Sequence, residues 1–222
     1  MADTQRQAWP NRRIEILVPT TMLCGLSTII QVWGLAYGFK IKRKLLLCDT
    51  LLVLAALLNI TSTSICYETT HYGQGRHIND PSVSKSHDLT QYNYYLWIGQ
   101  IINLIALTLL KYSICAYLLA LKFSQVYLGV VWVSILMLTV LNFLMPIINM
   151  FCRDPLEANW NRDIGGKCFM KIGESRLAYT QAISNIITNV IYIVAPIIYL
   201  FTFQLPRQTQ WGVCFICGLG FM

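Results

Sequence analysis

The run from Tyr94 to Leu121 constrains this chain more than any other feature, because it is apolar along its length and carries a single charge, Lys111. A helix over these residues is about 42 Å long, whereas the hydrocarbon core of a bilayer is about 30 Å thick. The run therefore predicts a transmembrane helix with room to tilt. At about 100° per residue, Gln100, Asn103 and Lys111 lie on one side of this helix, so we expect that side to face other helices.

The composition also favours a membrane protein, with 55% hydrophobic and 12% charged residues. These values exclude a disordered chain and are extreme for a soluble domain. A net charge of +7 is also found in nucleic-acid-binding proteins, but the bases of this chain lie in loops between apolar runs and not on one soluble face. We therefore expect the lipid bilayer as a partner and no binding to nucleic acid.

Polar loops divide the chain into five apolar runs of membrane-spanning length and the start of a sixth. We predict an all-α membrane protein in which residues 1–222 form a single transmembrane domain, built as an antiparallel helix bundle. The predicted spans are residues 14–39, 45–66, 94–121, 126–150 and 177–203, and residues 211–222 begin the sixth. This last run is only about 18 Å of helix. We therefore expect a bundle that is cut short inside its sixth helix.

The orientation follows from a dense cluster of bases, KIKRK at residues 40–44, which contains no acid. Cytoplasmic loops of membrane proteins carry such an excess of Lys and Arg. We therefore predict a multi-pass protein of the plasma membrane with its N-terminus outside. The two long polar loops, residues 67–93 and 151–176, then lie outside as well.

Two of the eight cysteines, Cys152 and Cys168, lie in the second of these loops, where the oxidising exterior allows a disulfide. Closing a loop of about 15 residues stabilises a protein by about 3 kcal/mol in the chain-entropy model. We predict that these two cysteines are bridged. Cys66, at the outer end of the second span, is the alternative partner.

The fifth span has polar residues at helical spacing, in an i, i+4, i+7, i+8, i+11 order. They are Gln181, Asn185, Thr188, Asn189 and Tyr192. This spacing places all five within an arc of about 100°, so we expect the polar stripe to face the bundle. Ile187 or Ile191 should then face lipid.

Asp49 and Lys111 are the acid and the base that we place inside apolar spans. A cation at mid-bilayer costs about 2.5 to 3.5 kcal/mol and is usually paired. The second helix runs inside to outside and the third runs back, so both charges fall in the same third of the bilayer. We predict that they form an ion pair. The alternative for Lys111 is that its side chain snorkels to the interface.

The chain contains none of the residue patterns of common soluble enzymes, such as a Walker loop or an HExxH helix. Cys214 and Cys217 have C-x-x-C spacing but lie in an apolar run, unlike a zinc ribbon. His71, His77 and His87 share one loop without the ligand spacing of a known metal site. We expect no catalytic, cofactor-binding or metal site.

Four passages, in order along the chain, carry the motifs of a known family. The first is YGQGRH at 72–77, with Gly73, Gly75 and His77; the second is Lys111-Tyr-Ser113; the third is Cys152, Pro155, Trp160 and Cys168; the fourth is the fifth span, with Asn185, Thr188 and Pro196. Together they resemble the fungal rhodopsin-like domain family of integral membrane proteins, which are receptor-like proteins of filamentous fungi with seven helices.

The resemblance implies a seven-helix, receptor-like protein that senses an extracellular or lipophilic cue. Its expected partners are a small lipophilic ligand and a cytoplasmic signalling protein. The sequence departs from the family pattern at Cys48-Asp49, where the family has two Asp residues, and at Asn189, where it has Asp. These losses of charge imply impaired signalling.

Two other functions fit the apolar spans. A membrane-embedded enzyme or accessory protein acting on a lipophilic metabolite would use Asp49 as its acid. A transporter is the third hypothesis, although the spans show no pair of broken helices at matching positions.

Overall fold

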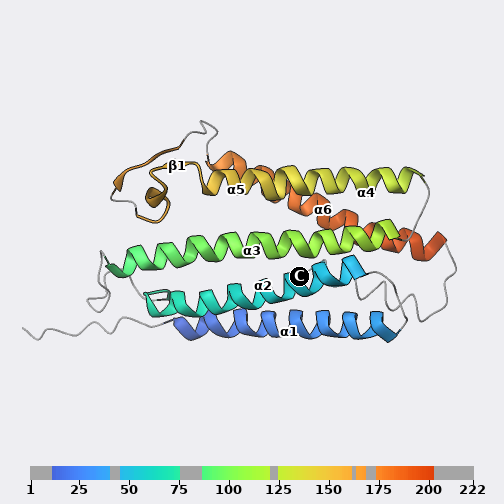
Figure 1. Ribbon diagram of the computed structural model, residues 1–222, viewed down its shortest axis with the longest axis horizontal. Coiled ribbons are helices and arrows are strands. Elements are labelled where there is room, and N and C mark those ends of the chain that lie inside the picture. Colours follow the sequence, from blue (N-terminus) through green and yellow to red (C-terminus); the bar gives the residue numbers. More distant parts are fainter. Residues whose placement is uncertain are drawn as a thin grey trace, which may run out of the picture.

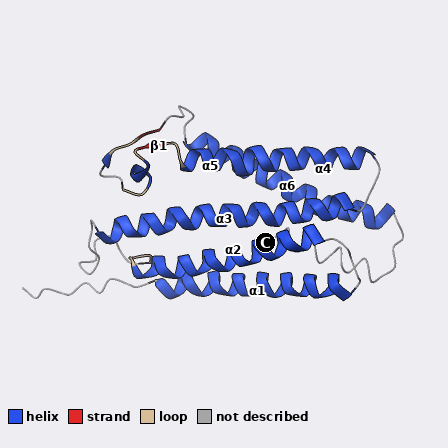
Figure 2. Cartoon of the chain, viewed as in Figure 1, coloured by secondary structure: helices blue, strands red, loops and turns tan. Residues whose placement is uncertain are grey.

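A computed structural model describes residues 12–40, 46–75, 87–120, 125–161, 164–168 and 174–202. These residues are almost entirely helical (Figures 1 and 2). The helices are α1 (Arg13–Lys40), α2 (Leu46–His71), α3 (His87–Ala120), α4 (Gln125–Met137), the π-helical segment η1 (Leu138–Leu144), α5 (Met145–Met150) and α6 (Glu174–Thr202). The predicted start of a sixth membrane helix, residues 211–222, lies outside the described residues, as do His77, Cys214 and Cys217.

The helices form an antiparallel bundle around α3. In Figure 1, α1 and α2 lie on one side of α3, α4 and α5 lie on the other, and α6 crosses obliquely. Within the described residues, four segments are long and apolar enough to cross a membrane, namely 13–36, 47–71, 88–119 and 125–150. Four of the predicted spans are therefore confirmed as candidate membrane helices. The predicted fifth span lies in α6, and its crossing of a membrane stays a prediction.

Two helix ends differ from the sequence prediction, because α2 continues to His71 and α3 already begins at His87. Both helices therefore continue through polar residues beyond the apolar runs. Asp88 lies in the first turn of α3, where a negative charge favours the helix dipole. The loop between the two spans is therefore shorter than predicted.

Aliphatic side chains, a cysteine and a tyrosine build the centre of the bundle. Cys115 of α3, Val131 of α4 and Tyr192 of α6 belong to one buried cluster. The outer faces instead expose large apolar side chains, including Trp33 and Trp132. This pattern is typical of a membrane protein, since lipid tails cover the outer face and close packing holds the helices together.

The loop that follows α5 is folded back on the bundle by a disulfide and by aromatic contacts. Its strands β1 (Arg153–Asp154) and β2 (Lys167–Cys168) pair antiparallel around the 3-10 helix Leu156–Asn159. The predicted disulfide between Cys152 and Cys168 is present, with Cα atoms 4.9 Å apart. Trp160 packs against Trp97 of α3, with ring centroids 5.1 Å apart. The loop is therefore anchored to α3.

The helix that contains α4 and α5 has an unusual segment in the middle. Pro146 has no backbone N–H, and its ring clashes with the carbonyl of Asn142 in a regular α-helix. The π-helical segment η1, Leu138–Leu144, ends two residues before this proline. Asn142 within it is buried and donates a hydrogen bond to Ser184 of α6, 3.0 Å away.

Gly75 lies in the turn after α2 and contacts the start of α1. Its φ is +80°, and its carbonyl accepts a hydrogen bond from the backbone N–H of Arg12, 2.9 Å away. A Cβ at this position would lie 2.9 Å from the backbone nitrogen of Arg13. The turn therefore requires glycine both for its backbone conformation and for space.

We expect Gly75→Ala to lower the free energy of unfolding by about 1–3 kcal/mol, because alanine in this conformation is strained and meets backbone atoms. Gly34→Ala is the matched control, since a Cβ at Gly34 of α1 meets nothing within 4 Å. Thermal unfolding of both purified variants in detergent measures the difference. Equal midpoints for the two variants would contradict this account of the turn.

A candidate ligand cavity between the helices

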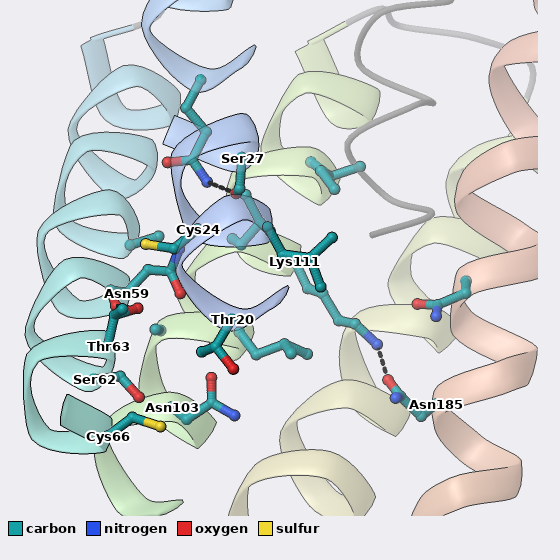
Figure 3. Close-up of a pocket in the computed structure, with 18 of the residues that line it drawn as sticks. Thr20, Cys24, Ser27, Asn59, Ser62, Thr63, Cys66, Asn103, Lys111 and Asn185 are labelled. Carbon is teal, nitrogen blue, oxygen red and sulfur yellow. Dashed lines mark hydrogen bonds between the residues drawn. The ribbon is translucent and has the colours of Figure 1, made fainter. Parts of the chain in front are cut away.

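A cavity of about 560 Å³ lies between α1, α2, α3 and α6 (Figure 3). Leucine, isoleucine and alanine side chains form much of its wall, including Leu23, Ala106 and Leu110. Polar side chains from all four helices also line it. They include Thr20 and Ser27 from α1, Asn59 and Thr63 from α2, Asn103 from α3 and Asn189 from α6.

Lys111 lies on the wall of this cavity and points toward α6 (Figure 3). Its side chain is only 5% exposed. The ammonium group donates hydrogen bonds to Oδ1 of Asn185 and to Oγ1 of Thr188, the latter 3.2 Å away. The Thr188 hydroxyl donates to backbone carbonyls of Ser184 and Asn185, so its oxygen is free to accept from lysine. Neutral acceptors of α6 therefore hold the cation.

The predicted ion pair between Asp49 and Lys111 is wrong. Asp49 accepts a hydrogen bond from the Tyr117 hydroxyl, and Ser113 donates to the carbonyl of Cys48, 2.9 Å away. Ser113 and Tyr117 are four residues apart and so lie on the side of α3 that faces α2. Lys111 comes two residues before Ser113, about 200° around the helix, and faces α6 instead. Its contacts with α6 also exclude snorkelling.

The five residues of the polar stripe on α6 differ in how deeply they are buried. Thr188 and Tyr192 are fully buried, whereas Gln181, Asn185 and Asn189 are half-buried. Of the two isoleucines expected to face lipid, Ile187 is 42% exposed.

The other isoleucine, Ile191, is partly buried and packs against the buried cluster. The helix α6 contacts both α3 and α4, so protein covers a wider arc of its surface than the polar stripe alone indicates.

A second cavity of about 290 Å³ lies between α3, η1, α5 and α6. Gln100, Asn142 and Gln181 contribute to its wall. Asn103 and Asn185 line both cavities. The polar residues predicted on α3 and α6 therefore line two neighbouring cavities, whereas the sequence suggested a direct contact between helices.

The contribution of α1 to the first cavity was missed by sequence reasoning. Thr20, Cys24, Ser27 and Gln31 all line it. These residues follow an i, i+4, i+7, i+11 spacing, which places them on one face of a helix. The same test that identified the stripe of α6 finds this face of α1.

Two side-chain oxygens in the cavity wall are buried without a hydrogen-bond partner in the described part of the chain. They are Oε1 of Gln31 and Oδ1 of Asn189. The amide nitrogen of Gln31 donates to Oγ of Ser27, 3.3 Å away. Buried amide oxygens normally accept a hydrogen bond, so both oxygens are exceptions in this wall.

The described motif residues of the turn after α2 and of the disulfide loop lie away from the cavity. Gly73 and Gly75 have positive φ in the turn after α2, and Pro155 and Trp160 lie in the disulfide loop. Pro196 lies within α6. Among the described residues, no group of His, Cys, Asp and Glu is arranged to hold a metal ion.

Comparison with known protein families finds a match to the fungal rhodopsin domain over residues 35–222. Searches of curated proteins and of solved structures each found no match. The matched region includes the four passages that carry the resemblance, and it covers most of the sequence. The chain therefore belongs to the fungal rhodopsin domain family of receptor-like membrane proteins.

Proposed function

We propose that this protein is a receptor that binds a small lipophilic ligand inside its helix bundle and reports it to a cytoplasmic signalling partner. The observation that carries the proposal is the cavity between α1, α2, α3 and α6. Its volume of about 560 Å³ is within the range of pockets for small molecules. Apolar walls with a few convergent polar groups are the usual lining of such pockets.

The proposed topology places α6 as a fifth span of a seven-helix bundle in the plasma membrane, with the N-terminus outside. The start of α1, the end of α2 and the disulfide loop lie at the same end of the bundle (Figure 1). A disulfide forms in an oxidising compartment, which supports an extracellular position for this end. The bases at residues 40–44 connect helices at the opposite end, where a cytoplasmic partner would bind.

The competing proposal of a membrane-embedded enzyme has weaker support. Its candidate acid, Asp49, accepts a hydrogen bond from Tyr117 and lines neither of the two cavities described above. An acid that protonates a substrate must reach it directly or through one water. The geometry around Asp49 therefore favours a structural role.

Photolabelling in lipid nanodiscs tests whether the cavity binds a lipophilic molecule. The probe is a long-chain alcohol that carries a diazirine and an alkyne, and mass spectrometry maps the labelled residues. We expect labels at the cavity-lining residues Leu107 and Leu110. Leu107→Trp should reduce this labelling at least about fivefold, because the larger side chain fills the cavity.

Leu96→Trp is the matched control, since Leu96 is an exposed leucine of α3 that lines neither described cavity. It should leave the labelling unchanged. Labels confined to outward-facing residues such as Trp132 would contradict the proposal. A cue-dependent change in cyclic-nucleotide or kinase signalling in the producing cell then tests the receptor role separately from binding.

A further inference from the structure

We propose that the ligand of this cavity is a lipophilic acid, whose anionic oxygen group binds Lys111 and whose chain carries a hydroxyl group. The inference rests on the proposed function, because it names the chemical class of the molecule in that site. Three observations support it: a buried cation without an acidic partner, two buried oxygens without donors, and an apolar space that joins them.

The first observation concerns the charge of Lys111. An ammonium group can donate three hydrogen bonds, and the two acceptors described for it, on Asn185 and Thr188, are neutral. None of the described carboxylates forms a salt bridge with it. A cation in the apolar part of a membrane is normally paired or turned toward a cavity. Lys111 is turned toward a cavity, and its charge is unpaired there.

Acidic residues are sparse in the sequence around Lys111 and along α6. No Asp or Glu occurs between Asp88 and Asp154, and none follows Glu174 in this sequence. Asp49, near the start of α2, accepts a hydrogen bond from Tyr117 on another side of α3. An anionic group brought by a ligand would therefore supply the missing charge. Charge-assisted hydrogen bonds of this kind are about twice as strong as neutral ones.

The second observation concerns the two unpaired oxygens of Gln31 and Asn189. Gln31 is only 3% exposed, and its Oε1 has no donor among the described residues. Asn189 on α6 has an unpaired Oδ1 in the same cavity wall. A hydroxyl group donates one hydrogen bond and so fits either oxygen, whereas a plain hydrocarbon chain leaves both unpaired.

The third observation is the wall between these polar groups. Leu23, Ala106, Leu110 and Ile114 line the same cavity and offer only apolar contacts. The molecule that fits has an anionic end, a hydrocarbon body and a hydroxyl group. A simple inorganic anion would leave the apolar wall uncovered, and a pure hydrocarbon would leave Lys111 unpaired.

Three photoactivatable probes with the same diazirine-bearing chain test the acidic group: a primary alcohol, a carboxylic acid and a phosphate monoester. The full chain is used in nanodiscs of neutral lipid, and the readout is the probe concentration that gives half-maximal labelling of the cavity. We expect at least one anionic probe to label at a concentration about tenfold or more below that of the alcohol.

Lys111→Met should remove this preference, so that the acid and the alcohol label alike. Lys167→Met is the matched control, because Lys167 is an exposed lysine of the disulfide loop, away from the cavity. It should keep the preference. Anionic lipid added to the nanodisc separates two sources of the anionic group. If the lipid reduces labelling by the anionic probe, the group belongs to a membrane lipid headgroup; if labelling is unchanged, the group belongs to a free acid.

Gln31→Leu tests the hydroxyl group with a second pair of probes, the acid with and without a hydroxyl on its chain. We expect the hydroxylated acid to label several-fold more efficiently in the unmodified protein and equally in the variant. Equal labelling by both acids in the unmodified protein would contradict the proposed hydroxyl group on the ligand. Water molecules would then be the donors to the two oxygens.

The outcomes separate this inference from the proposed function. Equal labelling of the cavity by acid and alcohol in the unmodified protein would overturn the acid while leaving a lipophilic site in place. This comparison needs no variant, so it stands even if Lys111→Met fails to fold. Absence of cavity labelling by all three probes would overturn both the acid and the lipophilic site.

Discussion

Replacing Cys152 and Cys168 together by serine is expected to lower the free energy of unfolding by about 2–5 kcal/mol. The bridge closes a loop of 16 residues in sequence separation, and its loss frees that loop in the unfolded chain. The loop also carries Trp160, which packs on Trp97, so its release removes contacts with α3. Thermal unfolding in detergent measures the loss, and the amount of protein at the cell surface should fall with it.

Cys66→Ser is the control for this experiment, since Cys66 is a half-buried free cysteine on α2. Its replacement should change the unfolding free energy by less than about 1 kcal/mol. Mass mapping of peptides under non-reducing conditions checks the pairing itself. Two free thiols at positions 152 and 168 in protein taken from the cell membrane would refute both the bridge and the extracellular placement of this loop.

Truncating Tyr192 to alanine is the second change with a large expected effect, a loss of about 3–5 kcal/mol. Tyr192 is 2% exposed and packs with Ile114, Cys115 and Val131 at the junction of α3, α4 and α6. Its removal leaves a void where three helices meet. Lipid cannot compensate, because helix association in a bilayer depends on close packing rather than on burial from water.

Tyr192→Phe separates the ring from the hydroxyl. It keeps the packing and loses the hydrogen bond that the Cys115 thiol donates, 3.2 Å from the tyrosine oxygen, so the expected loss is below about 1 kcal/mol. Tyr179→Ala on the same helix is the control, since that side chain is 72% exposed. Unfolding in denaturant measures the free energy of unfolding of the three variants. An equal loss for Tyr192→Ala and Tyr179→Ala would show that this junction is not the core.

The sequence predicted those features that depend on one helix or one loop at a time. Of the five apolar runs of membrane-spanning length, four correspond to candidate membrane helices, and two cysteines in one polar loop indicated the bridge. Polar spacing also pointed to the arc of α6 that contains Thr188. Each of these needs only the period of a helix or the length of a loop.

The features that sequence reasoning missed depend on how helices are rotated against one another. Opposite charge and a similar depth in the bilayer predicted a pair between Asp49 of α2 and Lys111 of α3. The rotation of α3 instead turns Lys111 toward α6, while Asp49 contacts Tyr117. The spacing on α6 could not show which of Ile187 and Ile191 faces outward, because the width of the contact between α6 and α4 is not visible in a single helix pattern. The role of Gln31 likewise requires knowing that α1 meets the same space as α6.

The π-helical segment η1 has a consequence for the shape of the second cavity. In a regular α-helix, residues four apart drift by about 40° at each step, so a row of them winds away from any fixed partner. The wider turn of a π-helix reduces this drift. Leu138, Asn142, Pro146 and Met150 follow a spacing of four and all line the second cavity. Regular α-helical winding of the same residues would turn Pro146 and Met150 away from that space, whereas a single-residue deletion within 138–144 would remove the π-helical turn and keep both residues directed toward it.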